Sequence, residues 1–356
     1  MADPIFDQPR NIPGFKVLAG GRALPDETIL DILTVQVCTY VEGASMFTVA
    51  FNNWHSREQD FKWIDVDLLS EGTELDVQVG FVDDFSTLIV GEVTAIEPEF
   101  PVDGTPILNI HGYDRLHRFR RGRKTRSFAN MKDSDVAEQI ARDLQLRAQA
   151  EDTQVTHDYL LQHNQTDIDF LLERARRIRY EVTVRDKTLH FRKAANHQSE
   201  VITLQYGHTL QSFYPRLSTM QQVSEVVVQG WNPKTKKAIV ARARTGDEVS
   251  TMNGTTLGAT VSEQAFFATE SVIVDTPVFS EGEALQIAKG KFNDMSVAFI
   301  MGEGTTIGNT RIRAGEVVAL EGLGERFSGL YYVTSATHTI NQSGYTTTFT
   351  VERNAT

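Results

Sequence analysis

Cysteine is nearly absent from this sequence, since Cys38 is the only one among 356 residues. A single cysteine excludes an internal disulfide and suits synthesis in a reducing cytoplasm. No apolar run approaches the ~20 residues that a helix needs to cross a bilayer, so we expect no membrane-spanning helix. The opening residues, MADPIFDQPRNIPG, lack the pattern of a signal peptide, and we expect no such leader.

Motifs for nucleotide binding or metal-dependent catalysis are also missing. Residues 322–329, GLGERFSG, contain Gly-x-Gly, but the next glycine has the wrong spacing for dinucleotide binding and no helix is expected to follow. Residues 301–310, MGEGTTIGNT, lack the lysine of a phosphate-binding loop. The nine histidines are scattered, without a His-Glu-x-x-His motif. The sequence therefore predicts no cofactor.

A few polar groups remain as candidates for a chemical site. His111 and His117 flank Asp114 and could be drawn as metal ligands, but no further ligand cluster accompanies them. Neighbouring carboxylates also stand on expected loops, namely Asp83, Asp84, Glu97 and Glu99. Such carboxylates are most often solvated surface charge, so we predict no catalytic residue, no metal site and no enzyme. A hydrolase stays open as an alternative, because a site made by shape needs no motif.

Charge is distributed unevenly along the chain. Residues 1–110 carry 5 Lys and Arg against 19 Asp and Glu, and residues 111–200 carry 18 against 14. The remaining residues carry 12 against 14, which together gives the net charge of −12. Such asymmetry indicates which surfaces meet partners or solvent. An acidic first third argues against nucleic-acid binding by that region.

The first third of the chain has the alternation of a β-structure. Residues 1–25 are rich in Pro and Gly, and we expect an N-terminal arm there. Residues 26–117 contain six short segments of alternating polarity separated by turn residues, which predicts a first β-barrel domain. The six segments are ILDILTVQVCTY, MFTVAFNNW, KWIDVDLL, ELDVQVGFV, STLIVGEVTAI and PILNIHGYD.

Residues 118–200 change character and predict a basic linker followed by a small α/β insert. One helix should start near KDSDVAEQIARDLQL, with Asp133 or Ser134 as its N-cap. A second helix should follow Thr166, which is also a good N-cap. The segment YEVTVRDKTLHFRKA then reads as a β-hairpin.

Residues 201–356 predict a second β-barrel domain with one amphipathic helix. The segment VSEVVVQGWNPKTKKAIVARA reads as two strands around an Asn-Pro turn, and EGEALQIAKGKFNDMSVAF has helical spacing of its apolar residues. The last residues read as three antiparallel strands, Glu316 to Leu320, Leu330 to Ile340 and Tyr345 to Glu352. In the last strand, we expect Tyr345, Thr347, Phe349 and Val351 to face inward and the other threonines outward.

These segments resemble the baseplate hub family of contractile tails, which includes phage late control gene D proteins, the VgrG hub module and hubs of extracellular contractile injection systems. The resemblance rests on the strand–Gly-Trp–Asn-Pro–strand unit, the helix after it, the Gly-Tyr-Thr-Thr run from Gly344 to Thr347, and the terminal Arg353-Asn354-Ala355. It covers about the last third of the chain. A Ser/Thr-Asp motif that opens a helix containing Phe-Leu, followed by a strand pair, is also similar to the family's insert.

A faint internal repeat supports two similar barrels. Residues 93–112 and 333–352 align without a gap at an offset of 240, with Val93/Val333, Thr94/Thr334 and Gly104/Gly344 identical. Each segment is preceded by a strand that a glycine introduces. Any two hairpins after a glycine turn can look this similar, so pattern alone leaves the duplication open.

One basic cluster lies at the start of the linker. RFRRGRKTR packs six cations into nine residues, namely Arg118, Arg120, Arg121, Arg123, Lys124 and Arg126. Contact with nucleic-acid phosphates is one interpretation. The other, which we favour, is a linker that pairs with acidic surfaces of this protein or a neighbour, such as residues 1–110. In a particle that carries DNA, the cluster could border the passage.

Together the residues and the resemblance imply a mainly β structural protein with two β-barrel domains around an α/β insert. The resemblance further implies a homotrimer in a ring, which joins a three-fold spike to a six-fold tail tube, with tube protein, spike protein and other baseplate subunits as partners. Nucleic acid is expected only in a phage. The chain would be made in the cytoplasm and act in a virion baseplate or an extracellular injection particle.

Two features keep alternatives open. The runner-up function is a phage-derived cell-wall hydrolase or carbohydrate-binding β module, which should show a pocket with converging carboxylates. No oligosaccharide-binding-type barrel or β-helical needle follows Thr356, unlike the VgrG pattern, so the spike is expected to be a separate subunit or the continuation of a longer chain.

Overall fold

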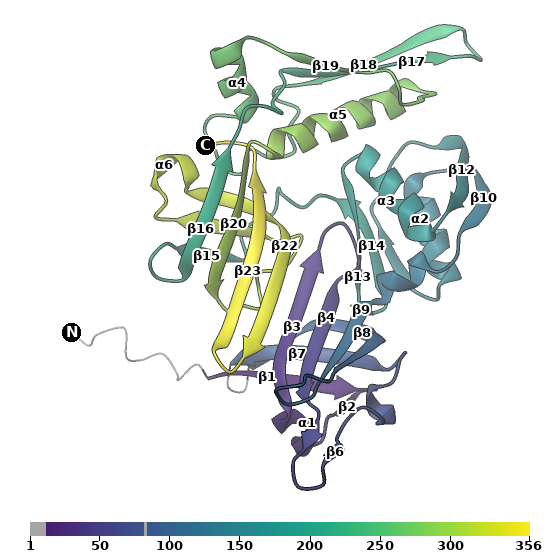
Figure 1. The fold of residues 1–356 in the computed structure, drawn as a ribbon. Helices are drawn as coiled ribbons and strands as arrows, with labels where there is room; N and C mark the ends of the chain where they lie inside the picture. The colour runs from purple at the N-terminus through teal and green to yellow at the C-terminus, as the bar shows by residue number, and fades with distance from the viewer. Residues whose placement is uncertain (1–11, 82–83) are drawn as a thin grey trace.

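The computed structural model describes residues 12–81 and 84–356, and it is mainly β (Figure 1). A 13-stranded sheet forms the centre of the molecule. Its strands from the first third of the chain are β1 (Pro13–Ala19), β2 (Arg22–Ala23), β3 (Ile32–Tyr40), β4 (Met46–Asn52), β7 (Glu74–Phe81), β8 (Asp84–Glu99) and β9 (Ile107–Asp114). Those from the last part are β15 (Ile202–Gln205), β16 (Leu210–Leu217), β20 (Ile300–Ile307), β21 (Val317–Glu321), β22 (Gly329–Asn341) and β23 (Gly344–Arg353).

The strands follow one hydrogen-bonded path, β16-β20-β23-β22-β3-β4-β9-β8-β7-β1-β2. Strand β21 pairs with the first residues of β22, and β15 pairs with β21. This path is open, so the described residues contain no closed barrel, and the prediction of closed barrels is wrong. The physical reason is the pairing of β3 with β22, which merges strands from both ends of the chain into one sheet.

The three C-terminal strands agree with the sequence prediction to within about two residues. In β23 the side chains of Tyr345, Thr347, Phe349 and Val351 are buried, whereas Thr346 is exposed and its alternating neighbours are half-buried. The predicted register of the closing strand is therefore confirmed. Alternation identifies it because one face of the strand packs on a core and the other does not.

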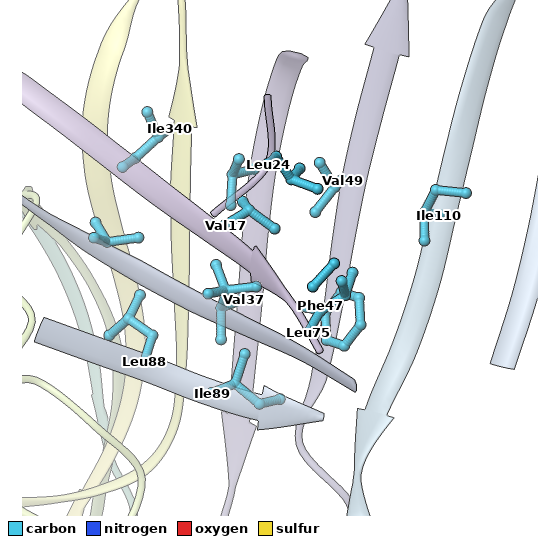
Figure 2. Packing of buried hydrophobic residues seen from close by; sticks show 14 of the residues in the cluster. Val17, Leu24, Val37, Phe47, Val49, Leu75, Leu88, Ile89, Ile110 and Ile340 are labelled. Atoms are coloured by element: carbon cyan, nitrogen blue, oxygen red, sulfur yellow. The ribbon is translucent and has the colours of Figure 1, made fainter. Parts of the chain in front are cut away.

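Two hydrophobic clusters lie along the central sheet. The first gathers residues of β1, β3, β4, β7, β8 and β9, for example Val37 and Leu75 (Figure 2). It also includes Ile340 from β22. The second gathers residues of β16, β20 to β23 and nearby loops around Tyr331 and Phe349. Ile340 thus contributes to the first cluster from a strand of the second, which ties the two parts of the sheet together.

The insert packs beside the sheet as a unit with its own core. It contains η2 (Arg115–Arg120), β10 (Lys124–Met131), α2 (Asp133–Asp143), β11 (Arg147–Ala150), β12 (His157–Gln165), α3 (Asp167–Arg177), β13 (Tyr180–Arg185) and β14 (Thr188–Lys193). Thr166 caps α3 as predicted, since its Oγ1 accepts from the N–H of Asp169 at 3.2 Å. For α2 the N-cap is Lys132, one residue before the earlier of the two predicted positions.

A smaller three-stranded sheet covers one end of the central sheet (Figure 1). Its strands are β17 (Glu225–Asn232), β18 (Lys237–Arg244) and β19 (Glu270–Ile273), and α5 (Glu281–Val297) packs on one face. The hairpin of β17 and β18 and the helix α5 both follow the sequence prediction. The remaining short elements are α1 (Asp26–Leu30), β5 (Trp54–His55), β6 (Asp60–Phe61), η1 (Asp67–Leu69), α4 (Gly258–Phe266) and α6 (Gly324–Phe327).

Two segments differ from their sequence prediction. KWIDVDLL, expected as a strand, forms only a 3-10 turn at its end, because side chains satisfy its polar groups: Asn53 accepts from the N–H of Trp63 at 2.8 Å, and Asp31 accepts from the indole at 3.1 Å. Residues 13–19 of the expected arm form β1, which pairs with β7. No helix in residues 12–81 and 84–356 is long and apolar enough to span a membrane.

Candidate assembly surfaces

The basic linker begins by binding the acidic first third of the same chain. Arg118 donates from Nε to Glu92 at 2.9 Å, and Glu92 is 8% exposed. The neighbouring Arg115 is itself buried and pairs with Glu74 and, at 2.7 Å, with Asp186. Opposite charges of the two regions thus pair within one molecule. The pairing stabilises the fold, because a buried charge without a partner costs free energy.

The rest of the cluster divides into paired and exposed cations. Lys124 and Arg126 lie 2.6 and 2.8 Å from the buried carboxylate of Asp167. Arg123 donates to the carbonyl of Asn164 at 2.8 Å. Arg120 and Arg121 are exposed. The contacts of Arg118, Lys124 and Arg126 follow the interpretation that we favoured from the sequence, and a role of the cluster in an interface or channel stays a prediction.

The arginines of the second insert helix join the insert to other elements. Arg176 contacts Glu42 at 2.8 Å, in the connection between β3 and β4. Arg177 contacts Glu283 of α5 at 3.2 Å. Arg174 remains inside the insert, where its Nε donates to Asp133 at 2.6 Å. The arginine-rich helix is therefore a structural joint.

Arg179 is the central cation of this joint. It lies 2.7 Å from Asp294 of α5 and 2.9 Å from Glu352 of β23, so one guanidinium connects three elements. Burial raises the pKa of both Asp294 and Glu352, and the positive charge of Arg179 opposes that rise. The stability of this joint therefore depends on the ion pairs that Arg179 forms with the two carboxylates.

A hollow of about 390 Å³ lies beside Arg179 and collects carboxylates of the sheet, insert and α5. Burial raises the pKa of Glu181 in this hollow to about 7, although the phenol of Tyr332 donates to it and Arg192 lies near. Converging carboxylates are what the hydrolase alternative requires. Here the others are bound to arginines of the insert, so the charges connect elements of the fold.

The remaining candidate residues are dispersed. Asp83 lies outside the described residues, and Asp84 starts β8, ~40 Å along the strand from Glu97 at its other end. Glu97 lies 3.3 Å from His111, and Glu99 accepts from Asn109 at 2.7 Å. Neither carboxylate is enclosed, as Glu97 is 65% exposed.

The three residues that could be drawn as metal ligands, His111, Asp114 and His117, also bind other partners. Asp114 accepts from the backbone N–H of Ser45 and Leu116, and burial raises its pKa to about 7. His117 contacts the carbonyl of Asp114 through Nδ1 and approaches Glu92 with its other nitrogen, at 3.5 Å. Within residues 12–81 and 84–356 no group of three His, Cys, Asp or Glu side chains could hold a metal ion.

The internal repeat is present in the backbone hydrogen bonds. Val93 of β8 accepts from the N–H of Gly72 at 2.8 Å and donates to Thr73 at 2.9 Å. Val333 of β22 accepts from Gly315 at 2.8 Å and donates to Glu316 at 2.9 Å. Both glycines have φ of +85°, a conformation that other residues rarely adopt. The same turn is thus made twice, with the two valines 240 positions apart and the two glycines 243 positions apart.

Irregularities of the strands repeat as well. A β-bulge follows Val93 in β8 and Val333 in β22, and the threonine inside each bulge donates to a carbonyl of the next strand. A second bulge lies between Ile32 and Thr34 of β3, and its counterpart lies between Leu210 and Ser212 of β16. Bulges are local insertions fixed by the strand pairing, so two coincidences point to one repeated fold.

The repeat extends to the order of strands. One part of the sheet has the order β3-β4-β9-β8-β7-β1, and the other has β16-β20-β23-β22-β21-β15. The two parts meet where β3 pairs with β22, from Tyr40 opposite Ser335 to Thr34 opposite Asn341. We call this pairing the internal seam. Its side chains also interact, since Thr337 donates to Cys38 at 3.4 Å.

His338, a residue of the internal seam, predicts a pH dependence of stability. Its Nε2 donates to the carbonyl of Ile312 at 3.0 Å and its Nδ1 accepts from the hydroxyl of Tyr345 at 2.8 Å, so the buried ring is neutral. Burial, with the charge of Arg313, lowers its pKa to about 3. Below pH 6.5 the unfolded chain binds a proton that the folded ring does not, and stability should fall toward pH 3 by about 1.4 kcal/mol per pH unit.

His338→Gln, which keeps a donor for Ile312, removes this titration. The variant should be less stable than the wild type at pH 7.5, and the difference should shrink as pH falls to 4.5. Urea unfolding of both proteins at pH 7.5, 5.5 and 4.5 measures it. A difference that stays constant across this range contradicts the expectation.

Comparisons with known proteins agree with this fold. A family model described as the Alg8 N-terminal domain matches residues 9–342. The chain belongs to this family. The sequence has no significant match among curated proteins.

Solved structures with the same fold come from phage tails and a secretion system. The 43 kDa tail protein of prophage MuSo2 from Shewanella oneidensis has a TM-score of 0.71 at 14% identity, covering 96% of this chain and 98% of its own. The tail protein from Neisseria meningitidis MC58 has a TM-score of 0.67 at 12% identity, covering 96% of both chains. The E. coli c3393 protein, a component of the type VI secretion system similar to T4 tail proteins gp27 and gp5, has a TM-score of 0.58 at 10% identity, covering 91% of this chain and 74% of its own. The chain therefore has the fold of these tail proteins.

Proposed function

We propose that this chain is the structural hub of a contractile phage tail or injection-system baseplate, and that it acts as a homotrimer without catalysis. The observation that carries the proposal is the duplication of turn, bulges and strand order within one chain. Three chains with two similar parts each present six similar units, so a trimer can meet a six-fold ring on one side. The folds of tail proteins and a secretion component support this choice.

The mechanism is symmetry adaptation and transfer of load. A spike protein would bind along the three-fold axis, the tail tube protein would bind the six similar units, and other baseplate subunits would bind around them. The mature protein would then be in a virion baseplate or an extracellular injection particle. Ion pairs that join sheet, insert and α5 suit this role, because they hold the parts of one subunit in a fixed arrangement.

The exposed cations Arg120, Arg121 and Arg123 extend the proposal. Because Arg118, Lys124 and Arg126 are bound to carboxylates of the same chain, these three arginines are the part of the cluster that projects from it. They would meet an acidic surface of a neighbouring subunit or border the passage of cargo. The hydrolase alternative is favoured by the buried carboxyls of Glu181 and Asp114, since burial raises the pKa of each to about 7.

The oligomer mass tests the hub directly. Sedimentation equilibrium at micromolar concentration should give three times the chain mass of 39.9 kDa for the protein alone, and the same trimer plus the bound partner when candidate tube or spike protein is added. An obligate interface of such a ring should bury more than about 2,000 Å² and persist on dilution. A stable monomer under all these conditions would count decisively against the hub.

A further inference from the structure

Several edges of the central sheet have no strand beside them in the described part of the chain, including the outer edges of β2 and β15, and two of these free edges are related by the repeat. One is the far edge of β16, which pairs only with β20 (Figure 1). The other is the edge of β8 beyond Val93, where β7 has ended and only β9 continues on the opposite side. Free edges present unsatisfied backbone donors and acceptors, which makes them sites for pairing with another strand.

These two edges are the repeat counterparts of the internal seam. The bulges after Val93 and Val333 show that each residue of β8 corresponds to the residue of β22 that lies 240 positions later. The bulge between Ile32 and Thr34 of β3 corresponds to the bulge between Leu210 and Ser212 of β16, so the offset from β3 to β16 is 178. In the seam, β3 pairs with β22. The counterpart of that pairing is β16 with β8, which one chain does not make within its described residues.

We propose that the free edge of β16 docks on the free edge of β8 of a second copy of this chain, in the register of the internal seam. This inference rests on the proposed trimer and names the surface that forms it. Each subunit would offer one edge of each kind, and such a head-to-tail contact closes into a ring.

The proposed register brings opposite charges together. Thr337 lies opposite Cys38 in the internal seam, and the counterparts of this pair are Glu97 and Arg216. Both are exposed on the single chain. Directly opposed residues of antiparallel strands have Cβ atoms about 5 Å apart, within reach of an ion pair. If one strand slipped by one residue, Glu97 and Arg216 would lie on opposite faces of the sheet and could no longer pair. The two charges therefore favour this register.

The neighbouring pairs fit as well. Ala336 and Thr39 correspond to Ile96 and Leu217, two half-buried apolar side chains that would cover each other. The next pair with charge, Glu99 opposite Tyr214, replaces a glutamine–threonine hydrogen bond of the internal seam. Tyr214 is 74% exposed on the single chain, and its hydroxyl could donate to the carboxylate.

Prolines interrupt the backbone ladder of this contact. The N–H of Val41 in the connection after β3 donates to the carbonyl of Thr334. Every second residue of β22 from Thr334 onward therefore turns its backbone N–H and C=O toward β3. Pro98 of β8 is the repeat counterpart of one of these residues. Its partner in the proposed register is Pro215 of β16. Neither residue has an N–H, so hydrogen bonds form only on either side of them. Proline also protects an edge from pairing with unrelated strands, which leaves the side chains to select the partner.

A disulfide in the expected register tests the contact. In a Cys38→Ala background, Glu97→Cys with Arg216→Cys should give covalent dimers and trimers after mild oxidation, since the proposed register places these two positions directly opposite each other. The matched control is Glu97→Cys with Ser212→Cys, which places the second thiol on the same face of β16 but ~13 Å further along the strand. The control should stay uncross-linked.

The outcomes separate this contact from the hub itself. Cross-linking of the first pair alone supports the contact. A trimer by sedimentation that does not cross-link, or that cross-links equally in the control, overturns the contact and leaves the hub intact. A monomer overturns both. As a second measurement, Arg216→Glu should weaken the trimer several-fold on dilution, and adding Glu97→Arg should restore it; no restoration overturns the assigned register.

Discussion

Replacing Phe349 with alanine should lower the free energy of unfolding by about 3–5 kcal/mol. Phe349 is 1% exposed and belongs to the second core cluster, among residues such as Tyr331 and Val351. Its ring also lies over Gly304 on the neighbouring strand, where a Cβ atom would be 2.5 Å from the ring. Truncation leaves a cavity that this closely packed position cannot fill. Such a loss is a large share of the ~5–15 kcal/mol that stabilises a typical domain.

The adjacent residue supplies a matched control. Thr348 is half-buried on the other face of β23, opposite Thr337 and Thr305. Thr348→Ala should cost well under 1 kcal/mol unless that face meets a partner subunit. Thermal melting and denaturant unfolding of both variants beside the wild type measure the effects. A protein that tolerates Phe349→Ala but melts early with Thr348→Ala would mean that the burial of β23 is misassigned.

Strand β23 also shows why part of the fold is readable from the sequence. Its side chains alternate between a core and a polar face, and this local period of two identifies both the strand and its buried residues. The same holds for the β17–β18 hairpin and for α3, which begins after a threonine cap. Each of these signals lies within about a dozen residues of the element that it specifies.

The arrangement of strands could not be read in the same way. The β3–β22 pairing joins residues about 300 positions apart, and no local pattern marks which strands will meet. The repeat of Val93 and Val333 indicated two related parts, but closing each part into a barrel was an inference from strand count. KWIDVDLL failed for a related reason, because its polar groups bind side chains outside the segment: Asp31, 32 positions before Trp63, accepts from the indole, and Asn53, 10 positions before it, accepts from the backbone N–H.

The charged residues also divide into contacts that the sequence predicts and contacts that only the folded chain shows. A high density of arginine near residue 118 and an acidic first third predict that the two will attract each other, and Arg118 does contact Glu92. Sequence could not assign the partners of Arg179, because Asp294 and Glu352 lie on elements more than 100 positions away. Their importance comes from burial, which only the folded chain shows.

Arg179→Met should cost about 3–5 kcal/mol of unfolding free energy at pH 8, because it removes one partner of a buried ion pair. Two carboxylates would remain without their cation, with the side chain of Glu352 19% exposed and that of Asp294 40% exposed. The backbone of Arg179 has φ of +55°, but methionine and arginine bear the same cost there, so the variant tests the charge. Arg179→Lys is the matched control, and it should retain a substantial part of the stability because it keeps a cation.

Acid should relieve the loss. Burial already raises the pKa of Asp294 and Glu352, and removal of the cation raises both further. A carboxyl whose folded pKa exceeds its unfolded value contributes stability below the unfolded pKa, and that contribution disappears as pH rises through the folded pKa. The difference between Arg179→Met and the wild type should therefore shrink from pH 8 to pH 5. Urea unfolding at both pH values measures it. An equal loss at both, or a loss for Arg179→Lys as large as for Arg179→Met, would show that packing of the side chain, and not its charge, holds the insert to α5 and β23.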